Sequence, residues 1–182
     1  MIYMFLADGF EQIEALATLD IMRRASIQVK TVSVSSSLEV KSTLDVFVKA
    51  DMTADEIKLD QSFEGLVLPG GMPGAKNLLA SPAVAKAIEY ADKKHLLISA
   101  ICASPFILGR AGVLKGKMAT CYPGFEDELK GADVKPDYVV SDDNIITGKG
   151  AGASLQFGLA IVTYLKGAET AKKTAENMQC PN

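Results

Sequence analysis

Leu96 to Pro105 read LLISAICASP, an apolar run that ends at a cysteine, with a proline three residues later. The run has the length of a strand and almost no polar face, as expected for a strand covered on both sides of a parallel sheet. A proline at this point fits the first turn of a helix. The stretch therefore predicts a buried strand over 96–101, a sharp turn at Cys102 and a helix over about 104–110.

Two more continuously apolar runs, at 2–7 and 64–69, have the same strand character. Helical spacing appears at 8–25, 81–94 and 153–167, and Asp8 with Glu11 predicts a capping box at the start of the first helix. A polar-faced hairpin is expected over 38–51. The alternation predicts a single α/β domain over 1–182, doubly wound and flavodoxin-like, with a mostly parallel sheet between two layers of helices.

The 182-residue chain has a formal net charge of −3 and no long run of Lys or Arg, which argues against a nucleic-acid partner. No apolar run is long enough to span a membrane. The opening residues lack the features of a signal peptide, and the cysteines are few, so we expect reduced thiols and a cytoplasmic protein. A single histidine and no C-x-x-C pair argue against zinc, and we expect no metal.

The position of Cys102 at a strand-to-helix turn predicts a reactive thiol. A helix N-terminus offers unpaired N–H groups and a positive dipole end, and both favour the thiolate, which is the reactive form. The alternative is a buried cysteine acting as a small hydrophobic residue, which the turn position disfavours. That alternative is the one we expect for Cys121 and Cys180.

Two other turns at the same edge of the predicted sheet supply partners for this thiol. The turn LPGGMPG leaves the N–H groups of Gly70 and Gly71 uncovered, which suits an oxyanion site, although such glycines often serve only chain reversal. Glu14 falls on the apolar side of its helix, between Phe10 and Ile21. We expect it to be buried with a raised pKa, rather than an exposed carboxylate that favours the helix dipole.

A fourth turn, TGKGAGAS, nearly matches the dinucleotide fingerprint through Gly148, Gly150 and Ala153. The fingerprint also needs a following strand that carries an acidic residue, and only a polar helix remains in the chain. We therefore expect no nucleotide cofactor. Gly150 and Ala151 are expected to line the pocket beside Cys102 instead.

Four stretches together carry a family resemblance: LVLPGGMPGAKNL, AICASP, TGKGAGASLQFGLAIVTYL and DGFEQIEALATLDIMRRA. With them the chain resembles the ThiJ/PfpI superfamily and, within it, the parkinsonism-associated deglycase branch. The resemblance implies a flavodoxin-like fold, usually as a homodimer. It implies that Cys102 is an elbow cysteine readily oxidised to sulfinic acid, that Glu14 bonds to it, and that Gly71 and Ala103 provide oxyanion-type N–H groups.

Three positions depart from that pattern. Ala103 stands where the proteolytic branch has a histidine after its cysteine, Tyr122 where the deglycase branch often has a histidine before a proline, and Leu44 where an arginine is usual. The lone histidine, His95, starts the strand that Cys102 ends, roughly 23 Å away at about 3.3 Å per residue. Because no Cys–His dyad is available within one chain, amide cleavage is disfavoured.

The leading hypothesis is a cysteine-dependent stress protein that acts on small reactive aldehydes, as a glutathione-independent glyoxalase or deglycase without a cofactor. Cys102 would be the nucleophile and Glu14 the general acid and base, with Gly70 and Tyr122 lining the pocket. The runner-up is a redox sensor or chaperone whose Cys102 reacts with an oxidant. A protease, an amidase or a thiamine-pathway protein is the least favoured reading.

Overall fold

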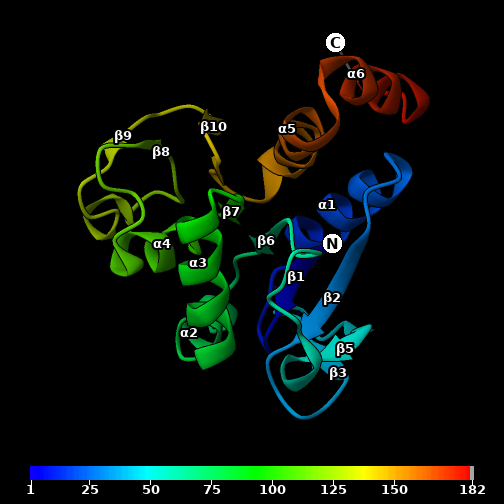
Figure 1. Ribbon diagram of the computed structural model, residues 1–182, viewed down its shortest axis with the longest axis vertical. Coiled ribbons are helices and arrows are strands. Elements are labelled where there is room, and N and C mark those ends of the chain that lie inside the picture. Colours follow the sequence, from blue (N-terminus) through cyan, green and yellow to red (C-terminus); the bar gives the residue numbers. More distant parts are fainter. Residues whose placement is uncertain (181–182) are drawn as a thin grey trace.

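The computed structural model describes residues 1–180, which form an α/β fold around a seven-stranded sheet (Figure 1). The sheet strands are β1 (Ile2–Leu6), β2 (Val29–Ser33), β5 (Met52–Thr53), β6 (Gly65–Leu68), β7 (Leu97–Ile101), β10 (Val139–Asp142) and β11 (Ile145–Gly148). Their order is β10-β11-β7-β6-β1-β2-β5, and only the β10–β11 pair is antiparallel. The predicted mostly parallel, doubly wound sheet is confirmed.

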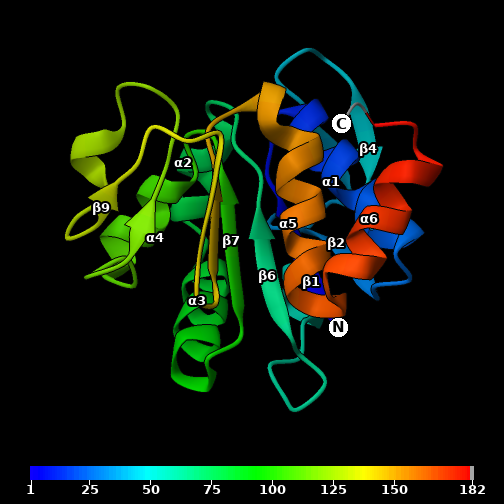
Figure 2. The same cartoon turned by 90° about the horizontal axis from the view of Figure 1, so that it is seen from above.

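Helices cover both faces of this sheet (Figure 2). One face carries α1 (Gln12–Arg24), α5 (Ser154–Lys166) and α6 (Ala168–Asn177), and the other carries α2 (Gly74–Leu79), α3 (Pro82–Lys94) and α4 (Pro105–Ala111). The helices α1 and α5 pack closely because Gly158 leaves room for Ile21: a Cβ on this glycine would lie 2.8 Å from the Ile21 Cδ1 atom.

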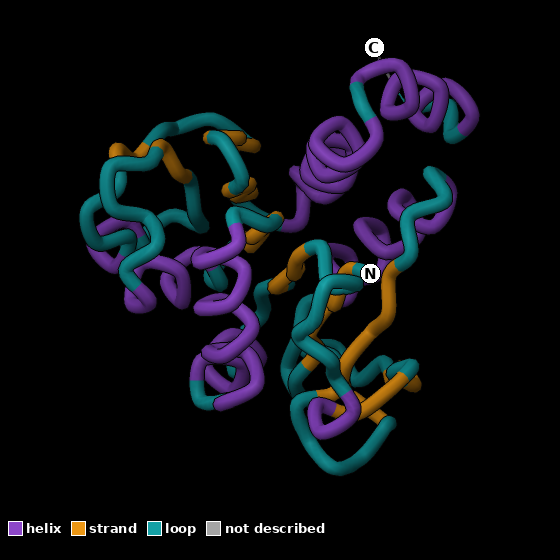
Figure 3. Tube along the Cα trace, viewed as in Figure 1, coloured by secondary structure: helices purple, strands orange, loops and turns teal. Residues whose placement is uncertain are grey.

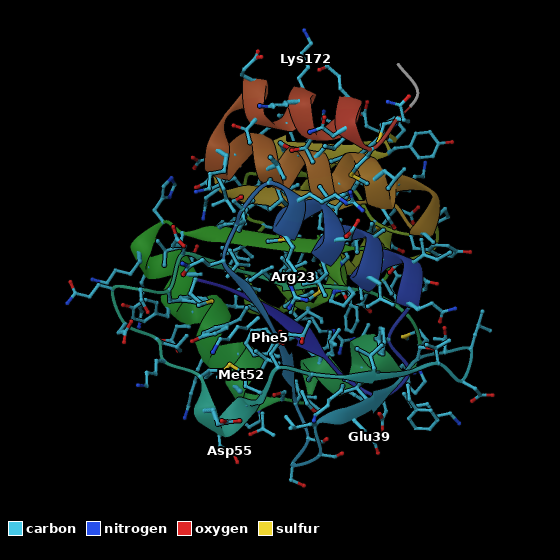
Figure 4. All side chains as sticks on the ribbon, turned by 90° about the vertical axis from the view of Figure 1, so that its right-hand side faces the viewer. Phe5, Arg23, Glu39, Met52, Asp55 and Lys172 are labelled. Atoms are coloured by element: carbon cyan, nitrogen blue, oxygen red, sulfur yellow. The ribbon has the colours of Figure 1, made fainter. Side chains whose placement is uncertain are left out.

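The core consists of two clusters of buried apolar side chains, one on each side of the sheet. Neighbouring residues of β1 alternate between them: Phe5 belongs to one cluster and Leu6 to the other. This alternation explains why the strand sequence is apolar throughout. Figure 4 shows Phe5 in the interior, whereas Lys172 of α6 points away from the molecule.

The remaining elements are short. They are β3 (Glu39–Lys41), β4 (Phe47–Lys49), β8 (Met118–Ala119), β9 (Asp133–Val134) and the 3₁₀ turns Ala54–Glu56, Glu126–Glu128 and Ala151–Ala153. The antiparallel pairing of β3 with β4 confirms the predicted hairpin. Figure 3 shows that the chain between α4 and β10 is mostly loop.

The capping box predicted from Asp8 is wrong. Glu11 is the N-cap of α1, and its own side chain accepts the N–H of Glu14 at 2.8 Å. The Asp8 carboxylate instead accepts the N–H of Lys41 in β3 at 2.9 Å. Asp8 therefore fastens the hairpin to the turn after β1, a contact with a residue 33 positions away in the chain.

Within residues 1–180, no helix combines the length and the apolar character that crossing a membrane requires.

Candidate active site

The turn after β7 places Cys102 at the edge of the sheet in a strained backbone conformation. Its φ is +65°, in the left-handed region that residues other than glycine rarely adopt. Two backbone hydrogen bonds hold the turn: the Cys102 N–H donates to the Gly148 carbonyl at 2.8 Å, and its carbonyl accepts the Tyr122 N–H at 2.7 Å. The arrangement resembles the nucleophile elbow of hydrolases.

A third bond ties this elbow to the neighbouring turn. The buried hydroxyl of Ser104 donates to the Pro69 carbonyl at 2.6 Å, which joins the end of β7 to the end of β6. Ser104 does not stand out in the sequence, because a serine before a proline at a helix start is typical of a helix cap. The structure shows no capping bond from this side chain.

Glu14 lies on the buried face of α1 and is only 1% exposed. Its Oε2 atom accepts the Gly70 N–H at 2.8 Å, and its carboxyl group hydrogen-bonds with the Cys102 side chain. Within residues 1–180, its second oxygen, Oε1, is buried and receives no N–H or O–H. The predicted burial of Glu14 is confirmed, and the structure brings this acid to the thiol from a helix 88 residues earlier in the chain.

Burial controls the protonation of this pair. It raises the pKa of Glu14 to about 7, although the hydrogen bonds from Cys102 and from the Gly70 N–H act in the opposite direction. Burial, together with the charge and hydrogen bond of Glu14, also raises the pKa of Cys102 to about 12. Our expectation that the helix N-terminus would favour the thiolate is therefore wrong in its net effect, because burial and the neighbouring acid outweigh the local dipole.

The two groups consequently titrate as a unit. The pair of Glu14 and Cys102 loses its first proton near pH 7, and the raised pKa of the thiol keeps the second proton on the pair well above neutral pH. The hydrogen bond between the two side chains gives this second proton a path between the sulfur and the carboxylate during a reaction.

The two glycines of the turn after β6 are required by the close packing around this pair. A Cβ on Gly70 would lie 2.6 Å from the Cys102 Cβ and 2.7 Å from the Glu14 Oε2. Gly71 has φ +88°, and a Cβ there would approach Glu11 N to 2.5 Å. Chain reversal alone therefore does not explain Gly70, because a larger side chain there would displace the reacting groups, whereas a larger side chain at Gly71 would displace the backbone before α1.

Backbone N–H groups of Gly71 and Ala103 act on the Cys102 sulfur from two different turns and lower its pKa against the stronger effect of burial. These are the residues that the resemblance assigned to oxyanion binding. Donors that face the sulfur are also suited to an oxygen bonded to the atom that the sulfur attacks.

The other predicted pocket residues form a separate hollow next to the elbow. Tyr122, Gly150 and Ala151 line a cavity of about 350 Å³, together with Pro123, Tyr138, Lys149, Gly152 and Ala153. Cys102, Glu14 and Gly70 are not part of its lining. The predicted pocket is therefore divided into a buried reacting centre and an open hollow, which meet at the Tyr122–Cys102 backbone bond.

His95 lies far from this centre, as its position in the chain predicted. It caps the end of α3, and its Nε2 atom lies 2.9 Å from a carboxylate oxygen of Asp143. The three cysteines are unpaired, and Cys121 is buried. In the described part of the chain, no group of three or more His, Cys, Asp or Glu side chains could hold a metal ion.

The fold and site define an α/β protein with a cysteine at a nucleophile elbow and a buried glutamate beside it. A profile described as the DJ-1/PfpI family matches residues 1–164, and the chain belongs to this family. Among its relatives is the Parkinson disease protein 7 homolog of Danio rerio, 35% identical over 169 residues, which are 91% of this chain and 89% of the relative. The glutathione-independent glyoxalase DJR-1.2 of Caenorhabditis elegans is 32% identical over 161 residues, 87% of this chain and 84% of the relative.

Solved structures of the family have the same fold. The C103A mutant of the DJ-1 superfamily protein STM1931 from Salmonella typhimurium has a TM-score of 0.93 at 35% identity, covering 100% of this chain and 98% of that one. Oxidised Toxoplasma gondii DJ-1 also has a TM-score of 0.93, at 31% identity, covering 98% of this chain and 97% of that one.

Proposed function

We propose that this chain, acting as one ThiJ/PfpI-type domain, converts small α-oxoaldehydes into 2-hydroxy acids without a cofactor. The observation that carries the proposal is the hydrogen bond between the Cys102 side chain and the buried carboxyl group of Glu14, next to the N–H groups of Gly71 and Ala103. A nucleophile, a mobile proton and an oxyanion site are the parts that such a reaction needs. The Caenorhabditis elegans relative is named as a glyoxalase that is independent of glutathione.

The reaction balances with these groups and water alone. The Cys102 sulfur adds to the aldehyde carbon while the thiol proton passes to Glu14, which then gives this proton to the new oxygen and forms a hemithioacetal. The carboxylate of Glu14 next removes the hydrogen of that carbon and delivers it to the neighbouring ketone carbon. The hydroxyl proton of the hemithioacetal passes to the ketone oxygen, so that the ketone becomes an alcohol and the carbon bonded to sulfur becomes the carbonyl of a thioester. Water hydrolyses the thioester, which releases the 2-hydroxy acid and restores the thiol.

The same geometry argues against amide cleavage. An amide requires a second acid to protonate the departing amine, and the usual donor is a histidine. Ala103 follows the cysteine directly, and His95 is engaged at the other end of β7. Glu14 is the acidic side chain that hydrogen-bonds with the thiol.

The test is turnover of methylglyoxal to lactate by the wild type, Cys102→Ser and Glu14→Gln. We expect no turnover with Cys102→Ser and a loss of about 100-fold or more with Glu14→Gln, the usual size of a general acid–base contribution. Full activity in Glu14→Gln would remove the assigned base. An inactive wild type whose Cys102 is oxidised stoichiometrically by peroxide would refute the enzyme proposal.

A second candidate is a redox sensor, and the donors around the sulfur favour it. The N–H groups of Gly71 and Ala103 and the proton of Glu14 could bind the oxygens of a sulfinate at Cys102. The Toxoplasma gondii relative is described as oxidised. Mass spectrometry after titration with peroxide tests this function: a gain of two oxygens confined to Cys102 supports it, and even oxidation of all three cysteines contradicts it.

We also propose that the protein is a cytoplasmic homodimer, in line with its unpaired thiols and with the family resemblance. Three apolar side chains, Ile13, Leu44 and Phe47, are each more than half exposed. They belong to α1 and the β3–β4 hairpin, which a backbone bond from Thr43 to Phe10 holds together. A second copy of the chain would cover this apolar face.

Sedimentation velocity of Leu44→Glu and Phe47→Glu tests the dimer. Both changes are expected to give a monomer, because each places a charge in the proposed interface. Met118→Glu is the control, since Met118 is also exposed but lies in β8. A dimer that survives both interface changes would contradict the assignment.

A further inference from the structure

The cavity beside the elbow is called here the tyrosine hollow. It is lined by Tyr122, Pro123, Tyr138, Lys149, Gly150, Ala151, Gly152 and Ala153. The pairing of β11 with β7 connects this hollow to the proposed nucleophile. Gly148 is opposite Ile101 in the β11–β7 pair, and its carbonyl accepts the Cys102 N–H at 2.8 Å. Two residues of extended chain span about 7 Å, so Gly150 lies within about 7 Å of Gly148, the residue bonded to the elbow.

Two tyrosine rings and the small residues 150–153 are part of the lining of the tyrosine hollow. Tyr122 and Tyr138 are 51% and 65% exposed, so both rings present uncovered surface to whatever enters. A Cβ on Gly150 would lie 3.4 Å from the Tyr122 ring, whereas one on Gly152 would have nothing within 4 Å. A side chain at position 150 would therefore contact the Tyr122 ring, whereas one at position 152 would extend into open space.

A cation lies over the ring of Tyr138. The Lys149 ammonium lies 5.7 Å from the centroid of this ring and donates to the Pro136 carbonyl at 2.9 Å. A tyrosine ring has few rotatable bonds, so it binds a planar group at a low cost in side-chain freedom. The volume of about 350 Å³ is at the lower end of the range for small-molecule sites, about 300–1,000 Å³. The single carbon of a methyl group would leave most of that space empty.

We propose that the tyrosine hollow binds the group attached to the reacting carbonyl, and that it selects α-oxoaldehydes with an aromatic or bulky apolar group over methylglyoxal. This inference rests on the proposed function, because it assigns the substrate class of the same site. With the aldehyde carbon bonded to the Cys102 sulfur, the remainder of the substrate extends past the Tyr122 backbone into the hollow. Tyr122 and Tyr138 are specificity residues in this arrangement, and Cys102 and Glu14 carry out the bond changes.

The experiment compares kcat/KM for phenylglyoxal and methylglyoxal in the wild type, Tyr138→Ala and Tyr164→Ala. We expect the wild type to prefer phenylglyoxal by at least tenfold. Tyr138→Ala should reduce the ratio of the two kcat/KM values by about three- to tenfold, the usual effect of one aromatic contact. Tyr164 is a matched control, because it is a partly exposed tyrosine on α5 outside the hollow, and its replacement should leave the ratio unchanged.

The outcomes separate this inference from the proposed function. Turnover of both aldehydes with equal kcat/KM, or with a ratio that Tyr138→Ala does not change, overturns the inference and leaves the glyoxalase proposal in place. An inactive wild type overturns the glyoxalase proposal, and the aromatic preference is then decided by binding to Cys102→Ser. Saturation-transfer NMR should show binding of mandelate and not of lactate, weakened by Tyr138→Ala; equal signals from the two acids overturn the inference.

Discussion

The replacement Glu14→Gln should make the protein more stable at the same time as it removes the catalytic proton. Below pH 4.5 the folded and unfolded chains both keep the proton of Glu14, so its burial carries no charge penalty. Between pH 4.5 and about pH 7 the unfolded chain releases the Glu14 proton while the folded chain retains it, because burial raises the pKa of Glu14 from 4.5 to about 7 in the folded state. The free energy of unfolding therefore falls as the pH rises through this window.

The size of the effect follows from the two pKa values. One pKa unit corresponds to about 1.4 kcal/mol, so the difference between 4.5 and about 7 amounts to about 3 kcal/mol. Glutamine has no charge to bury, and its amide can still accept the Gly70 N–H and donate to the sulfur. The quantity to compare is the free energy of unfolding of Glu14→Gln minus that of the wild type. This difference should be about 3 kcal/mol larger above pH 7 than at pH 4, which corresponds to about 6–12 °C in Tm.

Urea unfolding, followed by circular dichroism at pH 4, 6 and 8, measures this difference. The stability of Glu14→Gln minus that of the wild type should rise between pH 4 and 7 and then level off. Glu89→Gln is the control, because Glu89 is exposed and pairs with Lys93, which lowers its pKa; no gain is expected from it. Parallel pH profiles for Glu14→Gln and the wild type would refute the reasoning, since the carboxyl would then carry no burial penalty.

Three further predictions concern the elbow and its surroundings. Gly70→Ala should slow alkylation of Cys102 by iodoacetamide at least tenfold, because its Cβ would come within 2.7 Å of both reacting side chains, whereas Gly152→Ala should have no effect. The alkylation rate of the wild type should rise as the pH passes about 7, where the pair of Cys102 and Glu14 loses its first proton; a flat profile from pH 6 to 8 would contradict this titration. Ser104→Ala should cost about 1–3 kcal/mol in urea unfolding, because it leaves a buried carbonyl without its donor, and an unchanged midpoint would show that water replaces the hydroxyl.

The sequence was sufficient for the features that depend on local periodicity. The apolar runs identify β1, β6 and β7, and the helical spacing around Glu14 identifies an acid on the buried side of α1. Both predictions rest on residues a few positions apart, where the repeat of a helix or strand fixes which side chains share a face.

Features that depend on distant segments could not be obtained in this way. The role of Asp8 is decided by Lys41 in the hairpin, and the protonation of Cys102 by the burial that α1 and the turn after β6 impose on it. The helix dipole is visible in the sequence, whereas burial is a property of the assembled molecule. That difference explains why the thiolate expectation failed although the position of the cysteine was predicted correctly.

The shape of the elbow does not depend on its sulfur. The left-handed turn at Cys102 is held by the Gly148 carbonyl, by the Tyr122 N–H and by the Ser104 hydroxyl of the next residues, all through oxygen and nitrogen atoms. The side chain at position 102 can therefore be exchanged without removing any of these hydrogen bonds. A designer could install selenocysteine, serine or another nucleophile there and inherit the same crevice, the same donors and the same neighbouring acid, which makes this position a starting point for chemistry that the natural protein does not perform.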